Sequence, residues 1–450
     1  MKQPNVVFLF ADQWRAQAVG YAGDPNVKTP CLDALSRESV VFTGAVSNCP
    51  ICTPYRASLL SGRYPLSTGL FMNDLCLPDS GDSLAQVFKR NGYDTAYIGK
   101  WHLDGHGRSA YIPPERRQGF DYWKVLECTH DYNNSFYYSG GSAEKRRWPE
   151  YDAFSQTADA EEWLAGRKEK DKPFILLVSY GTPHNPYQTA PEDLKGMYDP
   201  QTLILRENVP AELAEKARVD LVGYYAHITA LDQCVQRIDN ALKKAGLGED
   251  TIFIVTSDHG DSMESQCDPA YPGVNKQRPY DESVMVPLLI RGPGLAPRKE
   301  DVLIASPDLM PTMLGLCGLP IPDCVEGMDY SSHLKGGERV ERDAVLIASY
   351  SPFADWRPER GGREFRGIRT MRYTYVEDID GPWLLFDNQA DPYQLKNIID
   401  DPTATPLRAI LGKRLREELR TLKDDFLPAA ELRKSWNYPV DPVGAIPYTN

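Results

Sequence analysis

Short apolar segments recur along the chain, and amphipathic segments lie between them. Their Val, Ile, Leu and Phe residues follow one another without polar alternation, which is typical of strands buried on both faces of a parallel sheet. Such strands are predicted at Val6–Phe10, Thr95–Ile98, Phe174–Tyr180, Thr251–Thr256 and Val286–Arg291. Helical periodicity predicts helices at Asp82–Asn91, Asp152–Arg167 and Ala211–Ala245. This alternation favours an α/β fold with a mostly parallel central sheet flanked by helices.

The pattern changes after about residue 335. Short strands joined by turns are predicted at Ala344–Ser349, Tyr373–Glu377 and Trp383–Asp387, and a helix at Pro406–Phe426. The proline-rich residues beyond this helix are expected to run extended over the surface. We therefore expect a main α/β domain at 1–340 and a smaller antiparallel α+β subdomain at 341–450. Weak periodicity at 105–151 predicts a long functional loop region.

The composition is that of a folded globular protein. Hydrophobic residues make up 42% of the 450 residues and charged residues 25%. Acidic residues outnumber basic ones by 63 to 50, which gives a net charge of −13. Nucleic-acid binding is not expected, because it needs a basic surface. No apolar run approaches the ~18 residues of a membrane span, so no membrane insertion is expected either.

The start of the chain does not resemble a secretory signal. The apolar run from Val6 to Ala11 has six residues, whereas a signal core has roughly 7–15 and is followed by a small-residue cleavage site. The nine cysteines are an odd number without repeated spacing, unlike a disulfide framework. We therefore expect a reducing, cytoplasmic location, or a periplasmic or secreted one if a signal was removed.

Two of the predicted strands are followed by an aspartate. Asp12 follows the first apolar run, and Asp258 follows Thr251–Thr256 and is itself followed by His259. Ligands of open α/β sheets bind beyond the carboxyl ends of the strands. Carboxylate oxygens from two strands suit a hard cation such as Ca²⁺ or Mg²⁺, and a histidine would admit Mn²⁺. Taken singly, each aspartate is equally well explained as a helix cap.

The segment CTPYRASLLSG at 52–62 predicts a two-turn helix that begins beside Cys52. Pro54 is placed as its first residue and Gly62 as the glycine that ends it. The Cys52 side chain would then lie at the positive end of the helix, where an anion is favoured and the pKa of a thiol falls. Arg56 returns to the same face four residues later. The alternative is a buried structural cysteine with an exposed arginine.

Further cationic groups follow other predicted strands. Lys100 and His102 follow the second strand and would point to one side of an extended chain. His184 lies between two prolines after the third strand, and Lys276 lies one loop beyond Asp258. Each would otherwise be a solvated surface group. Since only seven histidines are present, three of them beside strand ends indicate a functional cluster.

In this order, the segments resemble the type I sulfatases of the alkaline-phosphatase-like superfamily. The resemblance runs from Asn5 to about Asn397. It includes the strand with Asp12, CTPYRASLLSG, GKWH, PHNPY, SDHG, Lys276 ahead of YDESVMVPLLIRGPG, and RTMRYTYV…LLFDNQADPYQLKN. Each segment alone is weak, whereas the ordered set is specific. The resemblance implies the fold of that superfamily and a catalytic domain at 1–340.

The resemblance also implies a sulfuric-ester hydrolase that acts through formylglycine, made from Cys52 by a formylglycine-generating maturation enzyme. One hydroxyl of the hydrated aldehyde would attack sulfur, and Arg56 would stabilise the hydrate. A divalent cation, Ca²⁺ or else Mg²⁺ or Mn²⁺, would be bound. Its implied ligands are Asp12, Gln13, Asp258, His259 and the modified Cys52.

The remaining catalytic roles are implied for the other cations. Lys100 and Lys276 would bind sulfate oxygens. His102 would assist the diol, and His184 would protonate the leaving oxygen. One divalent cation, one arginine and two lysines would make the pocket positive inside an acidic protein, as an anionic ester requires.

Two positions depart from the family pattern. Gln13 stands where many members have a second aspartate, a form also similar to choline sulfatases and phosphonate monoesterases. Tyr55 stands where a small residue is usual, so recognition by the maturing enzyme is in question. A phosphodiesterase or phosphonate monoester hydrolase on the same scaffold is therefore the first alternative, and an inactive glycan-binding homologue is the second.

The expected substrate is a sulfated sugar, as a small molecule or an oligosaccharide, with an aryl sulfate as the simpler possibility. The region at 105–151 offers His130 and Asp131 with neighbouring Tyr and Asn side chains, which suit sugar rings and hydroxyls. Ordinary loop chemistry explains these residues equally well. Asn73 is expected to contact the sulfate or the rest of the substrate.

Overall fold

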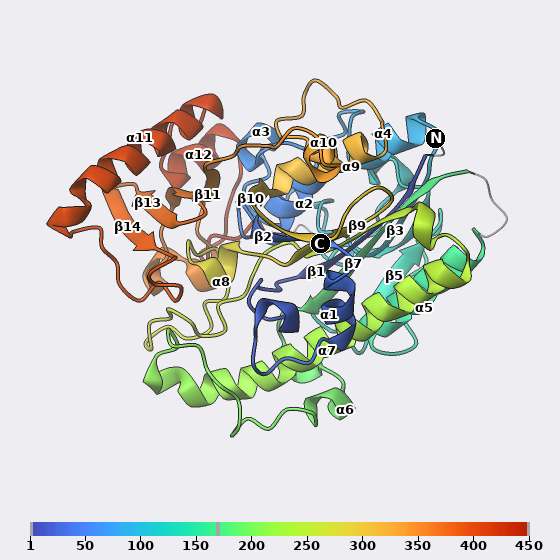
Figure 1. The fold of residues 1–450 in the computed structure, drawn as a ribbon, viewed down its shortest axis with the longest axis horizontal. Coiled ribbons are helices and arrows are strands. Elements are labelled where there is room, and N and C mark those ends of the chain that lie inside the picture. Colours follow the sequence, from blue (N-terminus) through green and yellow to red (C-terminus); the bar gives the residue numbers. More distant parts are fainter. Residues whose placement is uncertain (1–2, 168–171, 448–450) are drawn as a thin grey trace.

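The computed structural model describes residues 3–167 and 172–447 and is built around one large sheet (Figure 1). Its ten strands lie in the order β10-β2-β9-β8-β1-β7-β3-β4-β5-β6. Their bounds are β1 Asn5–Asp12, β2 Val40–Val46, β3 Asp94–Lys100, β4 Tyr122–Leu126, β5 Phe136–Ser139, β6 Arg146–Arg147, β7 Phe174–Pro183, β8 Thr251–Ser257, β9 Leu288–Arg291 and β10 Arg298–Ala305. Parallel pairing joins β8, β1, β7, β3 and β4, and joins β2 to β10.

Helices cover both faces of this sheet, as Figure 1 shows. Their bounds are α1 Pro30–Ser36, α2 Cys52–Ser61, α3 Pro65–Thr68, α4 Leu84–Arg90, α5 Asp152–Ala165, α6 Glu192–Lys195, α7 Ala214–Lys244, α8 Asp281–Val284, α9 Leu309–Leu316 and α10 Ser331–Leu334. The central strand β1 divides its side chains between the two layers. Val6, Phe8 and Phe10 pack toward α2, α4 and α9, whereas Val7 and Leu9 pack toward α1, α5 and α7.

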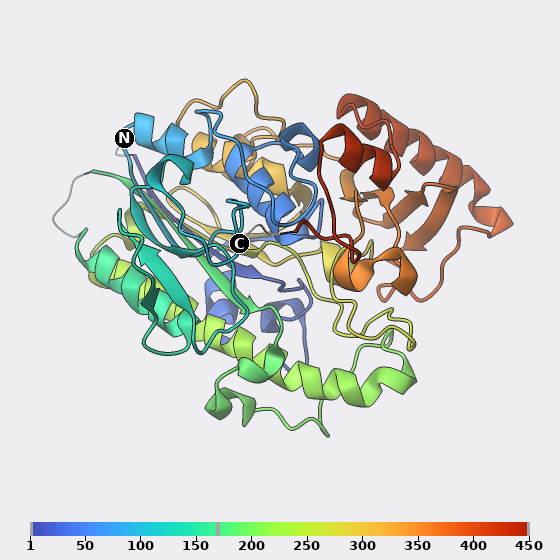
Figure 2. The same ribbon diagram turned by 180° about the vertical axis from the view of Figure 1, so that it is seen from behind.

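The C-terminal part is a second, antiparallel sheet in the order β11-β12-β13-β14. The strands are Val345–Ser349, Phe365–Arg369, Tyr373–Asp378 and Gly381–Asp387, and α11 (Thr405–Thr421) packs on them. Figure 2 shows this unit beside one end of the large sheet, next to α12 (Ala429–Ser435). The mostly parallel α/β sheet with a smaller antiparallel unit confirms the predicted fold class. The boundary predicted at 340/341 falls between α10 and β11.

The prediction of a parallel strand at Val286–Arg291 is wrong in direction. β9 begins at Leu288 and runs antiparallel to both of its neighbours, β8 and β2. Burial on both faces produces a continuous apolar run whichever way the strand runs, so composition carries no information on direction. The region at 105–151 was expected to be a loop, yet it contains β4, β5 and β6. β5 and β6 have only four and two residues, and most of their side chains are partly or fully exposed, so these segments lack the apolar runs that mark the central strands.

Several predicted element ends also differ from the structure. α2 begins at Cys52, so Pro54 is its third residue, and it has ten residues rather than two turns. Gly62 ends it in the left-handed conformation, with φ 65°, as predicted. The tail contains α12 where an extended chain was expected, because Leu432 packs into the main core; residues 448–450 of that tail lie outside the described residues.

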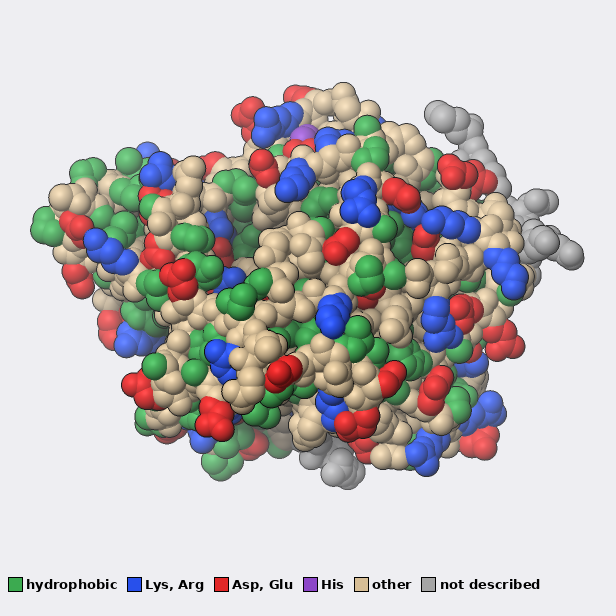
Figure 3. All heavy atoms as spheres, turned by 60° about the horizontal axis from the view of Figure 1, so that its bottom comes forward, with side chains coloured by type: hydrophobic (Ala, Val, Ile, Leu, Met, Phe, Trp, Pro, Cys, Tyr) green, Lys and Arg blue, Asp and Glu red, His purple; other side chains and the backbone are tan. Residues whose placement is uncertain are grey.

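The surface mixes charges of both signs. On the face drawn in Figure 3, basic and acidic side chains are interspersed and apolar groups are scattered among them. Among the described helices, none has both the length and the apolar character needed to cross a membrane. None of the nine cysteines lies in a disulfide bond.

Candidate active site

Two adjacent parallel strands of the large sheet bring the predicted aspartates together. β1 pairs with β8 so that Ala11 lies opposite Ser257, which places Asp12 beside Asp258 at the carboxyl ends of the strands. His259 follows Asp258, and Cys52 at the start of α2 completes the group. One side-chain atom of each of these four buried residues lies within 4.8 Å of the corresponding atoms of the others. The structure therefore assembles four of the five predicted metal ligands.

The Cys52 side chain lies in a positive environment. Its Sγ is 3.4 Å from Lys276 Nζ, 3.8 Å from Lys100 Nζ and 3.4 Å from His259 Nε2. Burial and Asp12 favour the neutral thiol, but the charges of Lys100, Lys276 and His259 outweigh them and hold the pKa of Cys52 well below its ordinary value. The surroundings of position 52 therefore stabilise a negatively charged side chain.

Arg56 lies one turn further along α2 and joins the elements of the site. Its Nη2 is 3.1 Å from Asp12 Oδ2 and 3.1 Å from Asp258 Oδ2. Its Nη1 donates to the carbonyl of Lys100 at 2.9 Å and to Ser179 Oγ at 2.7 Å. The side chain is 1% exposed, unlike the exposed arginine of the alternative interpretation. A guanidinium with this many fixed acceptors holds both carboxylates in place.

Lys100 and Lys276 approach position 52 from different segments. Lys100 Nζ forms an ion pair of 2.6 Å with Asp12 Oδ2. Lys276 Nζ donates to His184 Nε2 at 2.9 Å, while His184 Nδ1 lies 2.7 Å from the carbonyl of Asn185. Burial and the charge of Lys276 hold the pKa of His184 well below its ordinary value. His184 is therefore neutral at rest, with its proton on Nδ1 and its lone pair on Nε2.

His102 does not continue the strand in an extended conformation, because its φ is 58°. Its Nε2 lies 2.7 Å from Asp74 Oδ1, and Asp74 Oδ2 also accepts from Arg108 Nη2 at 3.0 Å. Burial would lower the pKa of His102, but Cys128 and Asp74 raise it to about 10. The imidazole is thus charged, and its buried Nδ1 has no hydrogen-bond partner among the described residues.

The donor set of the cluster fits a divalent cation. His259 Nδ1 lies 2.9 Å from the carbonyl of Gly260, so in the neutral imidazole that a metal would require, the proton lies on Nδ1 and Nε2 is the atom that would coordinate. Burial and the neighbouring Asp12 raise the pKa of Asp258 to about 6, a charge conflict that a cation relieves. Gln13 Nε2 donates to Asp261 at 2.9 Å, whereas its buried Oε1 has no partner among the described residues and is a neutral oxygen of the kind that hard cations accept.

These groups open into a polar cavity of about 190 Å³. Gln13, Cys52, Lys100, His102, His184 and Lys276 line it, together with the predicted substrate residues Asn73 and His130. The His130 ring stacks on His184, with centroids 4.6 Å apart and planes at 6°. Asn73 Oδ1 also accepts from the backbone N–H of Thr53 at 3.0 Å, so it helps to hold the start of α2. Asp131 is exposed and does not line the cavity; it accepts from the backbone N–H of Asn134.

Other cavity residues were not singled out from the sequence. Asp74 and Arg108 lie behind His102, and Asn275 precedes Lys276. Phe353, Ala354 and Asp355 come from the loop after β11, so the C-terminal unit contributes to the cavity wall. Asp74 directly follows Asn73, and its acidic side chain beside a candidate residue was an available signal. Nothing in the local pattern marks the loop after β11.

Comparison with known proteins identifies relatives over nearly the whole chain. The sequence model of the sulfatase family matches residues 4–319, and the one described as N-sulphoglucosamine sulphohydrolase, C-terminal, matches residues 273–421. An ulvan-active sulfatase of Formosa agariphila is 45% identical over 445 residues, which are 97% of this chain and 85% of the relative.

Solved structures share this fold over nearly the whole chain. A Bacteroides thetaiotaomicron structure, described in connection with the metabolism of glycosaminoglycans, gives a TM-score of 0.85 at 32% identity over 97% of this chain and 100% of its own. The phosphonate monoester hydrolase of Agrobacterium radiobacter gives 0.74 at 26% identity, over 94% of this chain and 96% of its own. The ordered motifs, the assembled cluster and these matches lead to one conclusion: the chain belongs to the sulfatase family.

Proposed function

We propose that this sulfatase releases sulfate from a sulfated polysaccharide or its fragments, with Cys52 converted to formylglycine and a calcium-like divalent cation beside it. The observation that carries this proposal is the position of Cys52, which is buried between two ammonium groups and two carboxylates yet lines a polar cavity. An oxidised side chain here adjoins both a metal-binding group and a site for an anion.

Two groups would add chemistry that the residues alone lack. Hydrated formylglycine supplies a nucleophilic hydroxyl at position 52, and a divalent cation supplies Lewis acidity. Asp12, Asp258, His259 and Gln13 would hold the cation together with position 52. The oxygen-rich donor set favours Ca²⁺ or Mg²⁺ over softer ions.

The chain's own cations bind and orient the ester. Lys100 and Lys276 flank position 52, and in this arrangement a sulfate placed there receives a hydrogen bond from each ammonium group. Arg56 keeps Asp12 and Asp258 ionised, since it pairs with both. The charge that develops on the sulfuryl oxygens is met by fixed donors in a buried site, where such interactions are strongest.

His184 is the proton donor to the leaving oxygen in this proposal. At rest its Nε2 accepts a hydrogen bond from Lys276 Nζ. A bound sulfate adds negative charge beside His184 and raises its proton affinity, so Nε2 takes up a proton from solvent as the ester binds and passes it to the departing sugar oxygen, while Lys276 stays charged and turns its N–H groups to the sulfate. The stacked ring of His130 keeps His184 in its plane.

A sugar substrate is supported by the cavity wall and by the relatives. Amide side chains of Asn73, Asn185 and Asn275 offer both donors and acceptors for hydroxyl groups. The 45% identical relative is named for its activity on ulvan, and the superposed Bacteroides structure is described in connection with glycosaminoglycans.

The test is a panel of defined sulfated mono- and disaccharides and ulvan fragments, assayed for free sulfate. We expect release from at least one sulfated saccharide, and Cys52→Ala is expected to abolish it while the circular dichroism spectrum stays unchanged. Cys324→Ala, at an exposed thiol, is the matched control and should keep full activity. Peptide mass spectrometry should show an aldehyde in place of the thiol at position 52; full activity of Cys52→Ala would overturn the proposal.

Hydrolysis of phosphonate monoesters or phosphate diesters is the second candidate activity. It is favoured by Gln13 in place of a second aspartate and by the similarity to the Agrobacterium radiobacter enzyme. Turnover of an aryl sulfate is to be compared with that of an aryl phosphate diester. Faster cleavage of the diester would make this the principal activity.

A further inference from the structure

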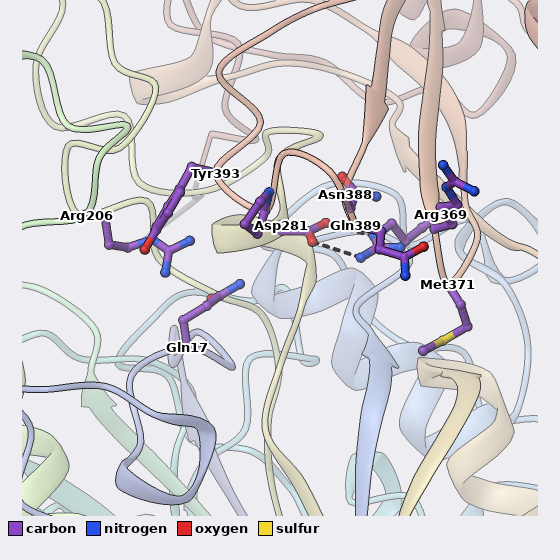
Figure 4. A pocket seen from close by; sticks show the side chains of 10 residues that line it. Gln17, Arg206, Asp281, Arg369, Met371, Asn388, Gln389 and Tyr393 are labelled. Carbon is purple, nitrogen blue, oxygen red and sulfur yellow. Dashed lines mark hydrogen bonds and ion pairs between the residues drawn. The ribbon is translucent and has the colours of Figure 1, made fainter.

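A second cavity, of about 590 Å³, lies where the large sheet meets the C-terminal sheet (Figure 4). Gln17 and Arg206 line it from the α/β domain, and Met371, Arg372, Gln389 and Tyr393 line it from the C-terminal unit. It shares no lining residue with the catalytic cavity, and its size falls in the range of about 300–1,000 Å³ that small-molecule sites occupy. None of the residues assigned to sulfate hydrolysis accounts for it.

The arginines of this cavity differ in how fully they are paired. Arg369 forms two hydrogen bonds with Asp281, at 2.8 and 2.9 Å, and is neutralised. Arg206 donates only from Nε, to buried Glu282 at 2.9 Å, and neither of its Nη groups has a partner among the described residues. Arg372 pairs with Asp387 through Nε and Nη2, and its Nη1 has no hydrogen-bond partner among the described residues. Cationic N–H donors are therefore left over beside the cavity.

Neutral groups in the same cavity suit a hydroxylated ring. The side-chain amide of Gln17 forms no hydrogen bond with any described residue, and Figure 4 shows its nitrogen at the tip that faces the cavity, so the cavity offers a neutral donor without an acceptor. The guanidinium of Arg206 lies 4.8 Å from the centroid of the Tyr393 ring. Figure 4 shows this guanidinium and the amide of Gln17 pointing toward the middle of the cavity, with Gln389 across from them.

We propose that this junction cavity is a non-catalytic binding site for a sugar unit that carries a carboxylate or sulfate group. The spare N–H donors of Arg206 and Arg372 would bind the anion, a ring hydroxyl would accept from the amide N–H of Gln17, and Tyr393 would contact the ring face. The choice of a glycan as ligand rests on the proposed function. Such a site would hold a polymer on the enzyme in addition to the catalytic cavity.

The test separates binding from turnover. The variant Arg372→Gln/Gln389→Ala changes two exposed side chains of the junction cavity. In the Cys52→Ala background, which leaves the polymer intact, its Kd is measured for ulvan, chondroitin sulfate, polygalacturonate and neutral dextran. We expect Kd for at least one anionic polymer to rise about tenfold, with no binding of dextran. With Cys52 present, turnover of a small aryl sulfate should change less than about twofold, which is within about 0.5 kcal/mol.

The matched control is Arg416→Gln, which removes an arginine of similar exposure on α11, paired with Glu377. It should leave every Kd unchanged. An unchanged Kd in the double variant, equal weakening in the control, or no binding of any anionic polymer would each overturn the site. Absence of sulfate release would instead refute the proposed function, and the two failures are distinguishable because binding and turnover are measured separately.

Discussion

At the residue scale, the active site is a set of buried ions that balance one another. Burial would raise the pKa of Asp12, but Lys100 and Arg56 hold it well below its ordinary value. Burial and the charge of Asp12 raise the pKa of the neighbouring Asp258 to about 6. Removing one member leaves an opposite charge buried without its partner, which costs more than the lost bond. The cluster therefore responds to substitution as a unit.

Asp74 offers a test of this coupling outside the predicted set. Asp74→Asn keeps the shape of the side chain but removes the negative charge that faces His102 and Arg108. We expect kcat to fall at least about tenfold, since the charged imidazole loses its partner. KM should change less, because neither predicted sulfate ligand is touched. Steady-state kinetics measure both; Asp79→Asn, on an exposed turn, is the control, and an unchanged kcat would contradict the coupling.

Cation binding should be measurable apart from activity. Metal-depleted protein is expected to unfold at a lower temperature, and Ca²⁺ at a hundredfold excess over its Kd should add about 2.7 kcal/mol to the free energy of unfolding. The reason is that the cation relieves repulsion between Asp12 and Asp258. Calorimetry with Ca²⁺, Mg²⁺ and Mn²⁺ ranks the ions, and Asp258→Asn should lose the effect. No shift with any of these ions would exclude the cluster as a cation site.

Individual residues could be predicted where they stand at a strand end or in a spaced motif. Asp12, Cys52, Asp258 and His259 meet this condition, and the structure places them together. Asp74 and Arg108 do not, because their role arises from the contact of two loops. Asp131 is a residue of suitable chemistry in the expected region whose loop turns it to solvent.

At the scale of elements, the packing of α7 controls the loop that carries His184. Gly223 in α7 lies against the short helical turn Tyr187–Thr189, and a Cβ there would be 2.2 Å from the carbonyl oxygen of Tyr187. The hydroxyl of Tyr187 in turn donates to Asp261 at 2.7 Å, which accepts from Gln13. The helix thus reaches the cation cluster through two hydrogen bonds.

Gly223→Ala should destabilise the protein, although alanine is normally better by ~1 kcal/mol inside a helix. Overpacking against the backbone of Tyr187 should cost about 1–3 kcal/mol and should lower kcat/KM as the His184 loop shifts. Urea unfolding and kinetics measure the two effects. The control is Gly196→Ala, where the added Cβ would meet nothing closer than 3.5 Å and stability should hold. If Gly223→Ala instead increased the free energy of unfolding, α7 and the turn at Tyr187–Thr189 would have to move apart at little cost.

The same helix contains a pH-sensitive group. Burial lowers the pKa of His227 from 6.5 to about 3, and its Nδ1 lies 2.6 Å from the hydroxyl of Tyr151. Below pH 6.5 the unfolded chain takes up a proton that the folded protein does not. The contribution of His227 to the free energy of unfolding is therefore complete above pH 6.5. It falls by about 1.4 kcal/mol for each pH unit between pH 6.5 and pH 3. His227→Gln should flatten this decline; urea unfolding at about pH 6.5 and about pH 5 measures it, and identical slopes would contradict it.

Elements with strong internal patterns could be predicted from the sequence, and those defined by their neighbours could not. The apolar runs in the sequence mark the buried strands β1, β3, β7 and β8, and helical spacing of apolar residues marks α5, α7 and α11. The direction of β9 and the existence of β5 and β6 depend on pairing partners from distant segments. α12 forms because Leu432 finds a place in the core, a tertiary effect that outweighs its proline-rich surroundings.

At the scale of the whole molecule, the two sheets share one hydrophobic core. The main core cluster includes Ala348, Tyr350 and Phe353 of the C-terminal unit. Asp281 before the last part of the large sheet pairs with Arg369 at the end of β12. The loop after β11 also lines the catalytic cavity, so loss of the small sheet would remove part of the site.

Arg369→Met tests this connection. It leaves the largely buried carboxylate of Asp281 without its ion pair, which should cost about 3–5 kcal/mol. We expect a single unfolding transition at a lower urea concentration, observed equally by tryptophan fluorescence and by circular dichroism. Arg369→Met/Asp281→Leu, which removes both charges, should recover much of the loss. Two separate transitions would show that the units fold independently.

β1 lies in the interior of the large sheet, between β7 and β8, yet it comes from the start of the chain, whereas both partners follow much later in sequence. Two fragments made by cutting the chain between β1 and β7 would each lack a complete set of charged groups. The rate at which turnover recovers after the fragments are mixed would therefore measure the insertion of β1 between β7 and β8. The recovery of helix content would not measure this step.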